Sequence, residues 1–287
     1  MSHGSTITEL IRRRYSCRTY DDTPIGPDKR QPLEEYIRLV AGGPLGSRLR
    51  FKLLAAEKED REALRGLTTY GFIRGATGFV LGAVGVGERD MEDFGYAAEQ
   101  IVLLATGLGL GTCWLGGTFR RSRFADRLGL RPGEQMPCVL SLGIPAGRRS
   151  LVDRLSRLGA GSDRRLPWPQ LFFDGGWDHP LDELAAGAYR TPLEMLRLAP
   201  SASNRQPWRV VRQGQAWHFF LQRTPGYHKV SEPLSNGIDL QRVDIGIAMC
   251  HFELTARELG LEGSWAQAGE GAAGLGVGEY VVSWVVK

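Results

Sequence analysis

"GYAAEQIVLLATGLGLGTCW" (Gly95–Trp114) is the stretch that decides the fold, because it returns 151 positions later as "GIAMCHFELTARELGLEGSW" (Gly246–Trp265). The two segments align without a gap, and the first is apolar on nearly all sides, which is typical of a core helix. Eight aligned pairs are identical: Gly95/Gly246, Ala97/Ala248, Leu103/Leu254, Ala105/Ala256, Leu108/Leu259, Gly109/Gly260, Leu110/Leu261 and Trp114/Trp265. The match favours an internal duplication over two unrelated core helices that both end in a glycine cap.

A duplication predicts two related halves, which we place at residues 1–165 and 166–287. A second, weaker similarity supports the duplication, since "LEEYIRLVAGG" (33–43) resembles "LEMLRLAPS" (193–201). Two such halves in one chain can imitate a two-fold dimer, with the central helices packed at the pseudo-dimer interface. The chain then needs no second copy, and we expect a monomer.

The rest of the chain mixes helices and strands without a steady βα repeat, which predicts an α+β fold. Ser5 or Thr6 is the expected N-cap of the first helix, and Pro192 is expected to break a later helix or to lie in its first turn. We expect helices at 6–16, 94–117, 120–130, 181–200 and 243–265, and within 21–42 a proline-rich loop followed by a helix that ends at Gly42. We expect strands at 50–57, 75–86, 136–145 and 278–287, with a hairpin at 208–223 turning near Gln213–Gln215.

Composition narrows the class of protein. The chain has 287 residues, 42% of them hydrophobic and 24% charged, with a formal net charge of +4, as in an ordinary soluble protein. The basic residues are spread out and show no recognition motif, so we expect no nucleic-acid binding. "MSHGSTITEL" lacks a signal core, and no apolar run approaches the ~18 residues that span a bilayer. We therefore expect a cytoplasmic protein that does not bind membranes.

Four cysteines are the candidate thiol ligands of the chain: Cys17, Cys113, Cys138 and Cys250. They lack the paired spacing of a zinc site, and no histidine stands at a matching distance. Reduced, buried cysteines are the expected state, and no metal site is predicted.

Two polar motifs carry the chemistry. "RRRYSCRTY" (12–20) gathers arginines around a serine, and the guanidinium fork suits a phosphate dianion. "APSASNRQPWRVV" (199–211) combines a helix-ending proline with Ser and Asn, which offer short donors and acceptors. Read alone, the first is also compatible with a solvated basic helix end, and the second with a turn that satisfies its own backbone. Which of Arg12, Arg13 and Arg14 faces inward is left open by the pattern.

With "AAEQIVLLATGLGLGTCWLGG" (97–117), "PCVLSLGIPAG" (137–147) and "RRLPW" (164–168), these motifs make the chain resemble the FMN-dependent nitroreductase family over most of its length. The resemblance implies a nitroreductase-like fold. In that family one subunit supplies the basic motif of each flavin site and the other supplies the Pro-Ser loop. Here the two halves would supply them, giving one site per chain, because the first-half loop has decayed to "GGPLGSRLRF" (42–51) and no second basic motif is present.

The resemblance also implies roles for individual residues. Arg14 and Arg18 would bind the FMN phosphate, assisted by Ser16 and the Tyr15 backbone, with Arg165 as a second basic contact. The turn from Trp114 to Gly117, which includes Leu115, would pass the N5 edge of the ring. A backbone amide there, at Gly116 or Gly117, can tune hydride acceptance, and the two glycines would leave room for a flat substrate. The expected ring and ribityl loop consists of Pro200, Ser201, Ala202, Ser203 and Asn204.

Two neighbours of that loop are expected to be structural. Gln206 would brace the loop, and Trp208 would lie in the core. No catalytic side chain is required, since the reactive chemistry belongs to the cofactor.

The activity implied is transfer of a hydride from NAD(P)H through FMN to a small, flat acceptor such as a nitroaromatic or a quinone. Two alternatives stay open at this point. One is a protein that binds or stores flavin without turnover, and the other is a degenerate scaffold that binds no flavin.

Overall fold

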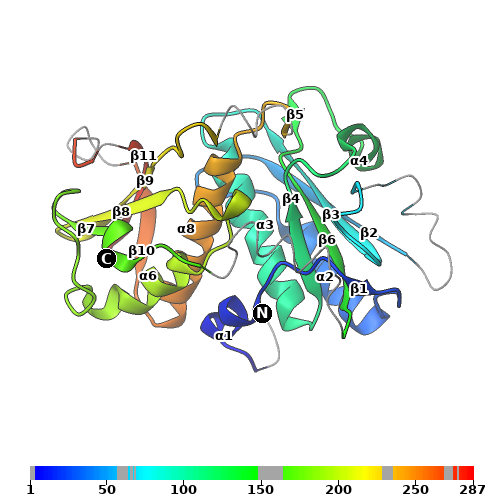
Figure 1. The fold of residues 1–287 in the computed structure, drawn as a ribbon, viewed down its shortest axis with the longest axis horizontal. Helices are drawn as coiled ribbons and strands as arrows, with labels where there is room; N and C mark the ends of the chain where they lie inside the picture. Colours follow the sequence, from blue (N-terminus) through cyan, green and yellow to red (C-terminus); the bar gives the residue numbers. More distant parts are fainter. Residues whose placement is uncertain are drawn as a thin grey trace.

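Two long helices form the centre of the molecule in this computed structural model, which describes residues 4–56, 64, 67, 69–147, 164–227, 235–267, 274–276 and 278–287. They are α3 (Asp90–Gly107) and α8 (Leu240–Glu258), and they cross side by side with one sheet on either side (Figure 1). Both helices are buried on nearly all sides. This is the arrangement that an apolar surface all round a helix requires.

Gly95 and Gly246 let the backbones of α3 and α8 touch. A Cβ atom on Gly95 would collide with the carbonyl oxygen of Val243, and one on Gly246 would collide with the carbonyl oxygen of Glu92. The contacts are reciprocal, since Glu92 and Val243 stand 151 positions apart in the sequence, as the two glycines do. Reciprocal contacts of this kind are the geometry of a two-fold interface.

Each sheet contains four antiparallel strands in an equivalent order. The first sheet runs β4-β6-β3-β2 and the second runs β10-β11-β9-β8. The first set is β2 (Leu49–Ala55), β3 (Gly78–Gly85), β4 (Gly111–Leu115) and β6 (Val139–Pro145), joined at its edges by β1 (Tyr20–Asp21) and β5 (Glu134–Gln135). The second set is β8 (Trp208–Gln213), β9 (Ala216–Leu221), β10 (Gly263–Ala266) and β11 (Glu279–Val286), with β7 (Phe172–Asp174) parallel to β8.

Shorter helices lie around this frame. Thr6 is the N-cap of the first, and with Glu9 it forms a capping box that satisfies two backbone donors of the first turn. The α-helices are α1 (Ile7–Arg13), α2 (Pro27–Leu39), α4 (Arg121–Leu128) and α6 (Arg190–Arg197), and the 3₁₀ turns are Trp168–Gln170, Gly187–Tyr189 and Ala202–Asn204.

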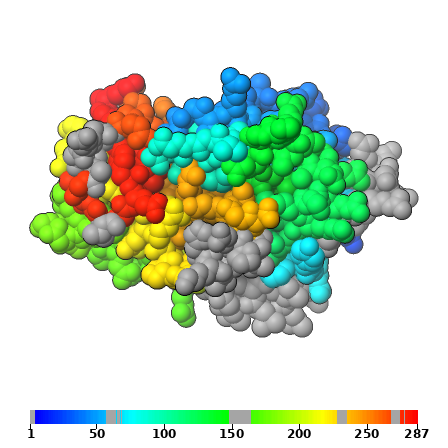
Figure 2. Space-filling view, turned by 90° about the horizontal axis from the view of Figure 1, so that it is seen from above, coloured from blue at the N-terminus to red at the C-terminus, as the bar shows by residue number. Residues whose placement is uncertain are grey.

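The α+β class is confirmed, and so are the hairpin at 208–223 and the N-cap at Thr6. Figure 2 shows the blue-to-green segments filling one end of the molecule and the yellow-to-red segments filling the other. The proposed boundary at 165/166 lies beside residues 148–163, which are outside the described residues. The division into two halves therefore stays a prediction.

Several expected helices have other bounds in the structure. The one expected over 243–265 is α8, which begins at Leu240 and ends at Glu258, and Gly263–Ala266 form β10 instead. The helix expected to end at Gly42 ends at Leu39, because Val40 leaves it with an extended backbone. Of residues 181–200 only Arg190–Arg197 are α-helical, with Pro192 in the first turn, where no N–H is needed. The helix expected over 94–117 ends at Gly107, because Gly109 takes a φ of 74° and the chain then pairs with β6 as β4.

We expect Gly95→Ala to destabilise the fold, because the added methyl group would meet the Val243 carbonyl with no flexible side chain to move aside. The loss should be about 1–3 kcal/mol or more, the usual range for overpacking, and Gly246→Ala should behave alike. Urea unfolding measures it. Gly85→Ala is the matched control, since nothing lies within 4 Å of a Cβ there. Equal stability of Gly95→Ala and Gly85→Ala would contradict the close approach of the helices.

Candidate functional site

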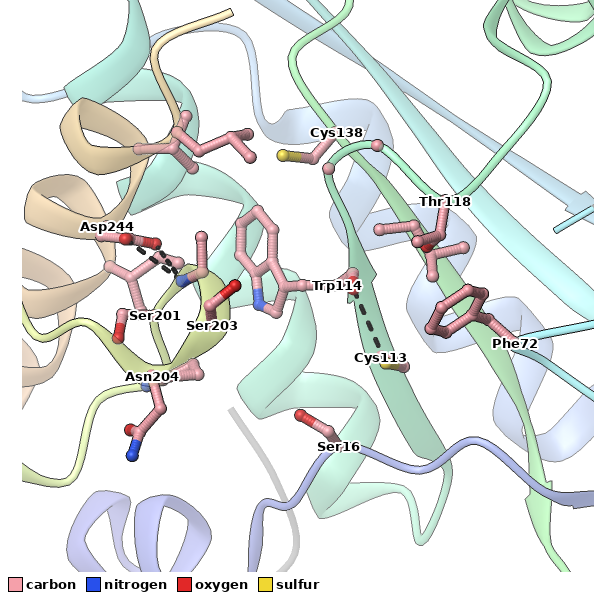
Figure 3. Close-up of a pocket in the computed structure, with 18 of the residues that line it drawn as sticks. Ser16, Phe72, Cys113, Trp114, Thr118, Cys138, Ser201, Ser203, Asn204 and Asp244 are labelled. Atoms are coloured by element: carbon pink, nitrogen blue, oxygen red, sulfur yellow. Dashed lines mark hydrogen bonds between the residues drawn. The ribbon is translucent and has the colours of Figure 1, made fainter. Parts of the chain in front are cut away.

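A cavity of about 470 Å³ lies beside the α3–α8 pair, lined by β4 and the turn after it, by α8 and by loops from distant parts of the chain. Its size is typical of small-molecule sites. Every residue for which the sequence predicted a cofactor contact lines it: Arg14, Tyr15, Ser16, Arg18, Leu115, Gly116, Gly117, Arg165, Pro200, Ser201, Ala202, Ser203 and Asn204. Figure 3 shows the Trp114 indole between β4 and the loop that carries Ser201, Ser203 and Asn204, with Ser16 below it.

The arginine motif reaches the cavity along the first residues of β4. Ser16 pairs with Thr112 in a parallel bridge, and the Cys17 N–H donates to the Thr112 carbonyl at 2.8 Å. Arg14, which ends α1, has a side chain only 7% exposed, and its Nε lies 3.8 Å from Glu99 Oε1. Arg12 is exposed, and neither it nor Arg13 lines the cavity. The structure thus identifies Arg14 as the inward-facing residue of the run.

The turn after β4 is held from outside the cavity. Arg121 Nη2 donates to the Gly116 carbonyl at 2.8 Å. Because the N–H and C=O groups of one trans peptide point in opposite directions, the N–H of Gly117 points away from Arg121. Gly117 itself lines the cavity, so this turn can offer a backbone donor to a ligand.

The room expected beside Gly116 is already occupied. A Cβ atom on Gly116 would lie 2.8 Å from Cδ1 of Leu240, at the beginning of α8. The first glycine of the turn therefore allows the second half of the chain to approach β4. The expectation that it leaves space for a substrate is wrong at this position.

The loop after α6 has an unusual backbone. Ser203, Asn204 and Gln206 have φ angles of 49°, 54° and 50°, in the left-handed region. Each such residue costs roughly 1–2 kcal/mol, and Asn is the residue type among them that tolerates it best. Conformations of this kind persist where surrounding contacts fix them, often at ligand sites.

Several hydrogen bonds fix this loop. Both carboxylate oxygens of Asp244 accept from the Ala202 N–H, at 2.9 and 3.1 Å. Gln206 donates from its backbone to Ser201 Oγ at 2.9 Å and accepts the Leu166 N–H at 2.8 Å. The prediction that Gln206 braces the loop is confirmed, and Trp208 is fully buried in the core as predicted.

Arg165 joins the loop to the segment that enters the second half. Its Nη1 donates to Asn204 Oδ1 at 3.2 Å, and its Nη2 donates to the Leu198 carbonyl at 3.1 Å. The side chain is half-buried at the cavity wall. Guanidinium groups from two distant segments, Arg14 and Arg18 near the N-terminus and Arg165, therefore line the same cavity as the Ser-Asn loop.

The charges of the lining favour an anion. Arg14, Arg18 and Arg165 are permanently cationic. Burial raises the pKa of Asp244 well above its usual value, with Asp239 adding to the effect, which reduces the negative charge in the wall. Burial also raises the pKa of the Cys138 thiol to about 12, so this sulfur is neutral near pH 7.

Asp93 is the counterpart of Asp244 in the first half, 151 positions earlier. It accepts hydrogen bonds from the backbone of Leu45 and Ser47, both at 2.8 Å. It does not line the cavity. A Cβ atom on Gly43 would collide with the Asp93 side chain, so the first-half loop lies flat against its carboxylate.

Trp114, with which the predicted turn begins, also lines the cavity. Sequence reasoning missed part of the lining: Phe72, Ile73, Cys113, Thr118, Cys138, Tyr227, Ser235, Leu240, Val243, Asp244 and Ile247. The α8 residues among them, Leu240, Val243, Asp244 and Ile247, lie within six positions of Gly246, where the repeat begins, and this was a usable signal. Phe72 and Ile73 stand in a segment with no polar pattern, and nothing marked them.

Two further classes of site were tested on the described part of the chain. No group of three or more His, Cys, Asp or Glu side chains there is arranged to hold a metal ion. No helix within the same residues has both the length and the apolar character needed to cross a bilayer.

The fold and the site together define an α+β protein that encloses an arginine-lined cavity beside its two central helices. The family model described as "Putative TM nitroreductase" matches residues 6–256, and the chain belongs to this nitroreductase family. The solved structure of a nitroreductase of the same description from Thermotoga maritima has a TM-score of 0.62 and 20% identity, over 100% of this chain and 96% of that one. It shows the same fold.

Smaller solved nitroreductases match only about half of the chain. One from Desulfovibrio desulfuricans, in complex with FMN, has a TM-score of 0.39 and 24% identity over 53% of this chain and 96% of its own. One from Bacteroides fragilis with bound FMN has a TM-score of 0.39 and 20% identity over 52% of this chain and 92% of its own. No curated protein matches the chain.

We expect Asp244→Asn to change how stability depends on pH. Because the folded pKa of Asp244 is raised, its contribution to stability is fully present below the unfolded pKa of about 4 and is lost as pH rises through the folded pKa. The variant lacks this titration, so its stability relative to the wild type should increase from pH 4 to pH 8. Urea unfolding across this range measures the difference, and parallel profiles would show that the buried carboxyl is not perturbed.

Proposed function

We propose that this protein is an FMN-dependent oxidoreductase. The observation that carries the proposal is one cavity in which three arginines and a strained Ser-Asn loop converge from distant parts of the chain. The donor set fits FMN: cationic forks suit a phosphate dianion, and short hydroxyl and amide groups suit ribityl hydroxyls and a pyrimidine edge. Membership of the nitroreductase family supports the same reading.

Arg14, Arg18 and Arg165 would hold the phosphate, with Ser16 and the Tyr15 backbone beside them. The Arg14 side chain is only 7% exposed. Partial burial strengthens a charged hydrogen bond because the local dielectric constant is lower than that of water. The fork geometry also fixes the direction of the phosphate, as a lysine would not.

The turn from Leu115 to Gly117 and the loop from Pro200 to Asn204 would hold the ring and ribityl chain. The Gly117 N–H is the donor we assign to the N5 edge, since Arg121 fixes the orientation of its peptide. When bound, FMN would accept a hydride from NAD(P)H and pass it to a small, flat acceptor such as a nitroaromatic or a quinone. Apolar wall residues such as Phe72 and Leu240 exclude water around a flat ligand.

We also propose that the two halves, 1–165 and 166–287, arose by duplication and act as an intramolecular pseudo-dimer. The reciprocal contacts of Gly95 and Gly246 support this, as do the shared strand order and the paired roles of Asp93 and Asp244. The first-half loop, held flat against Asp93, supports a single flavin site per chain. A monomer is then complete by itself.

Purified protein reconstituted with FMN should show the bound-flavin absorbance spectrum at one flavin per chain, and NADH or NADPH should bleach it under anaerobic conditions. An added nitroaromatic or quinone should restore the colour. Bound flavin that neither nucleotide reduces would instead identify a flavin-binding or storage protein. No bound flavin would rule out the proposed function.

Arg14→Ala and Arg18→Ala should each weaken FMN binding about tenfold or more, as expected for a lost hydrogen bond to a charged group. The stabilisation of the wild type by saturating FMN, on the order of 2–4 kcal/mol, should shrink accordingly. Fluorescence titration and thermal unfolding with and without FMN measure both effects. Arg12→Ala is the matched control, an exposed arginine of the same run that does not line the cavity. Equal losses in all three variants would indicate a general charge effect.

A further inference from the structure

Glu99 is a fully buried carboxylate on α3 that does not line the cavity. Three nitrogen groups surround it. Trp114 Nε1 donates to Oε2 at 2.9 Å, His251 Nε2 lies 3.0 Å from Oε1, and Arg14 Nε lies 3.8 Å from Oε1. A buried carboxylate is tolerated only with such partners.

Two of these partners, Arg14 and Trp114, line the cavity, and the third, His251, lies in the core. Arg14 comes from the basic motif, and Trp114 comes from β4, directly before the glycine turn. His251 lies on α8, and its Nδ1 is 2.9 Å from the carbonyl oxygen of Met195 on α6, the helix that leads into the Ser-Asn loop. One carboxylate is thereby connected to all three segments that form the proposed flavin site.

The hydrogen-bond chemistry requires a proton between Glu99 and His251. A carbonyl only accepts, so Nδ1 of His251 must carry a hydrogen toward Met195. Nε2 then either donates a second hydrogen to an ionised Glu99 or accepts one from a protonated Glu99. The pair is neutral in sum in both cases, which makes its complete burial tolerable.

We infer that Glu99 is a positioning residue, which fixes Arg14 and Trp114 in the geometry that FMN requires. The inference rests on the proposed flavin site. Glu99 acts through its neighbours and touches neither the cavity nor a ligand in it. His251 completes the arrangement by locking the carboxylate to α8 and α6.

The chain contains its own matched control. Glu253 on α8 is a buried carboxylate that accepts from Trp265 Nε1, from the Tyr96 hydroxyl at 2.8 Å and from Arg257 Nε at 2.7 Å. Trp265 is the counterpart of Trp114 in the repeat. Neither Trp265 nor Tyr96 lines the cavity, so loss of Glu253 disturbs the same helix pair without disturbing the site.

The test compares Glu99→Ala, Glu99→Gln and Glu253→Ala. Glu99→Ala should weaken FMN binding about tenfold or more. Glu99→Gln should weaken FMN binding less than Glu99→Ala does. Its amide can still accept from Trp114 and donate to a neutral His251, whereas the ion pair with Arg14 is lost. Glu253→Ala should lower the unfolding temperature of the flavin-free protein as Glu99→Ala does, with FMN affinity of the folded protein within about threefold of the wild type.

A second readout needs no flavin. The indole N–H resonance of Trp114, assigned by its absence in Trp114→Phe, should move upfield in Glu99→Ala and stay in place in Glu253→Ala. Wild-type FMN affinity in Glu99→Ala, an equal loss in Glu253→Ala, or no rescue by Glu99→Gln would overturn the inference. Failure of the wild type to bind FMN would refute the proposed function instead, and an unmoved indole resonance would then refute the anchoring of Trp114 separately.

Discussion

The backbone contact between α3 and α8 at Gly95 and Gly246 is the constraint on which the rest of the structure depends. With no side chain between them, the helices approach until carbonyl oxygens of one meet the α-carbons of the other. This proximity brings the beginning of α8 against the turn after β4, where Leu240 packs on Gly116. Trp114 and the loop that carries Ser201, Ser203 and Asn204 line the cavity beside this contact.

Polar pairs across the same interface fix its register. Glu99 meets His251, Tyr96 meets Glu253, and the carboxylate of Glu92 receives a bidentate contact from Arg242, with Nε at 3.0 Å. Each pair joins α3 to α8, and each group would be costly to bury alone. A slip or rotation between the helices would separate all of these partners together. Walls that belong to different halves therefore keep a single relative position, which a cofactor site needs.

Much of the site could be predicted from sequence because its residues cluster in motifs. The parts that could not be predicted depend on long-range pairing. "GTCW" after Gly109 is as apolar as the helix before it, and only its pairing with β6 makes it a strand. Phe72 and Ile73 reach the cavity through tertiary packing alone. The left-handed backbone of Ser203 and Gln206 could not be predicted from sequence either, since neither residue type favours this conformation.

Two equivalent positions of the sequence repeat show that a repeated anchor does not by itself make a binding loop. Asp93 and Asp244 occupy matching positions, and each carboxylate accepts backbone N–H groups from the loop above it. The first-half loop lies so close that Gly43 has no space for a side chain beside Asp93. The second-half loop meets Asp244 only through the Ala202 N–H and then turns away in left-handed steps. The backbone conformation of the loop that each aspartate binds therefore decides whether an open cavity remains beside it.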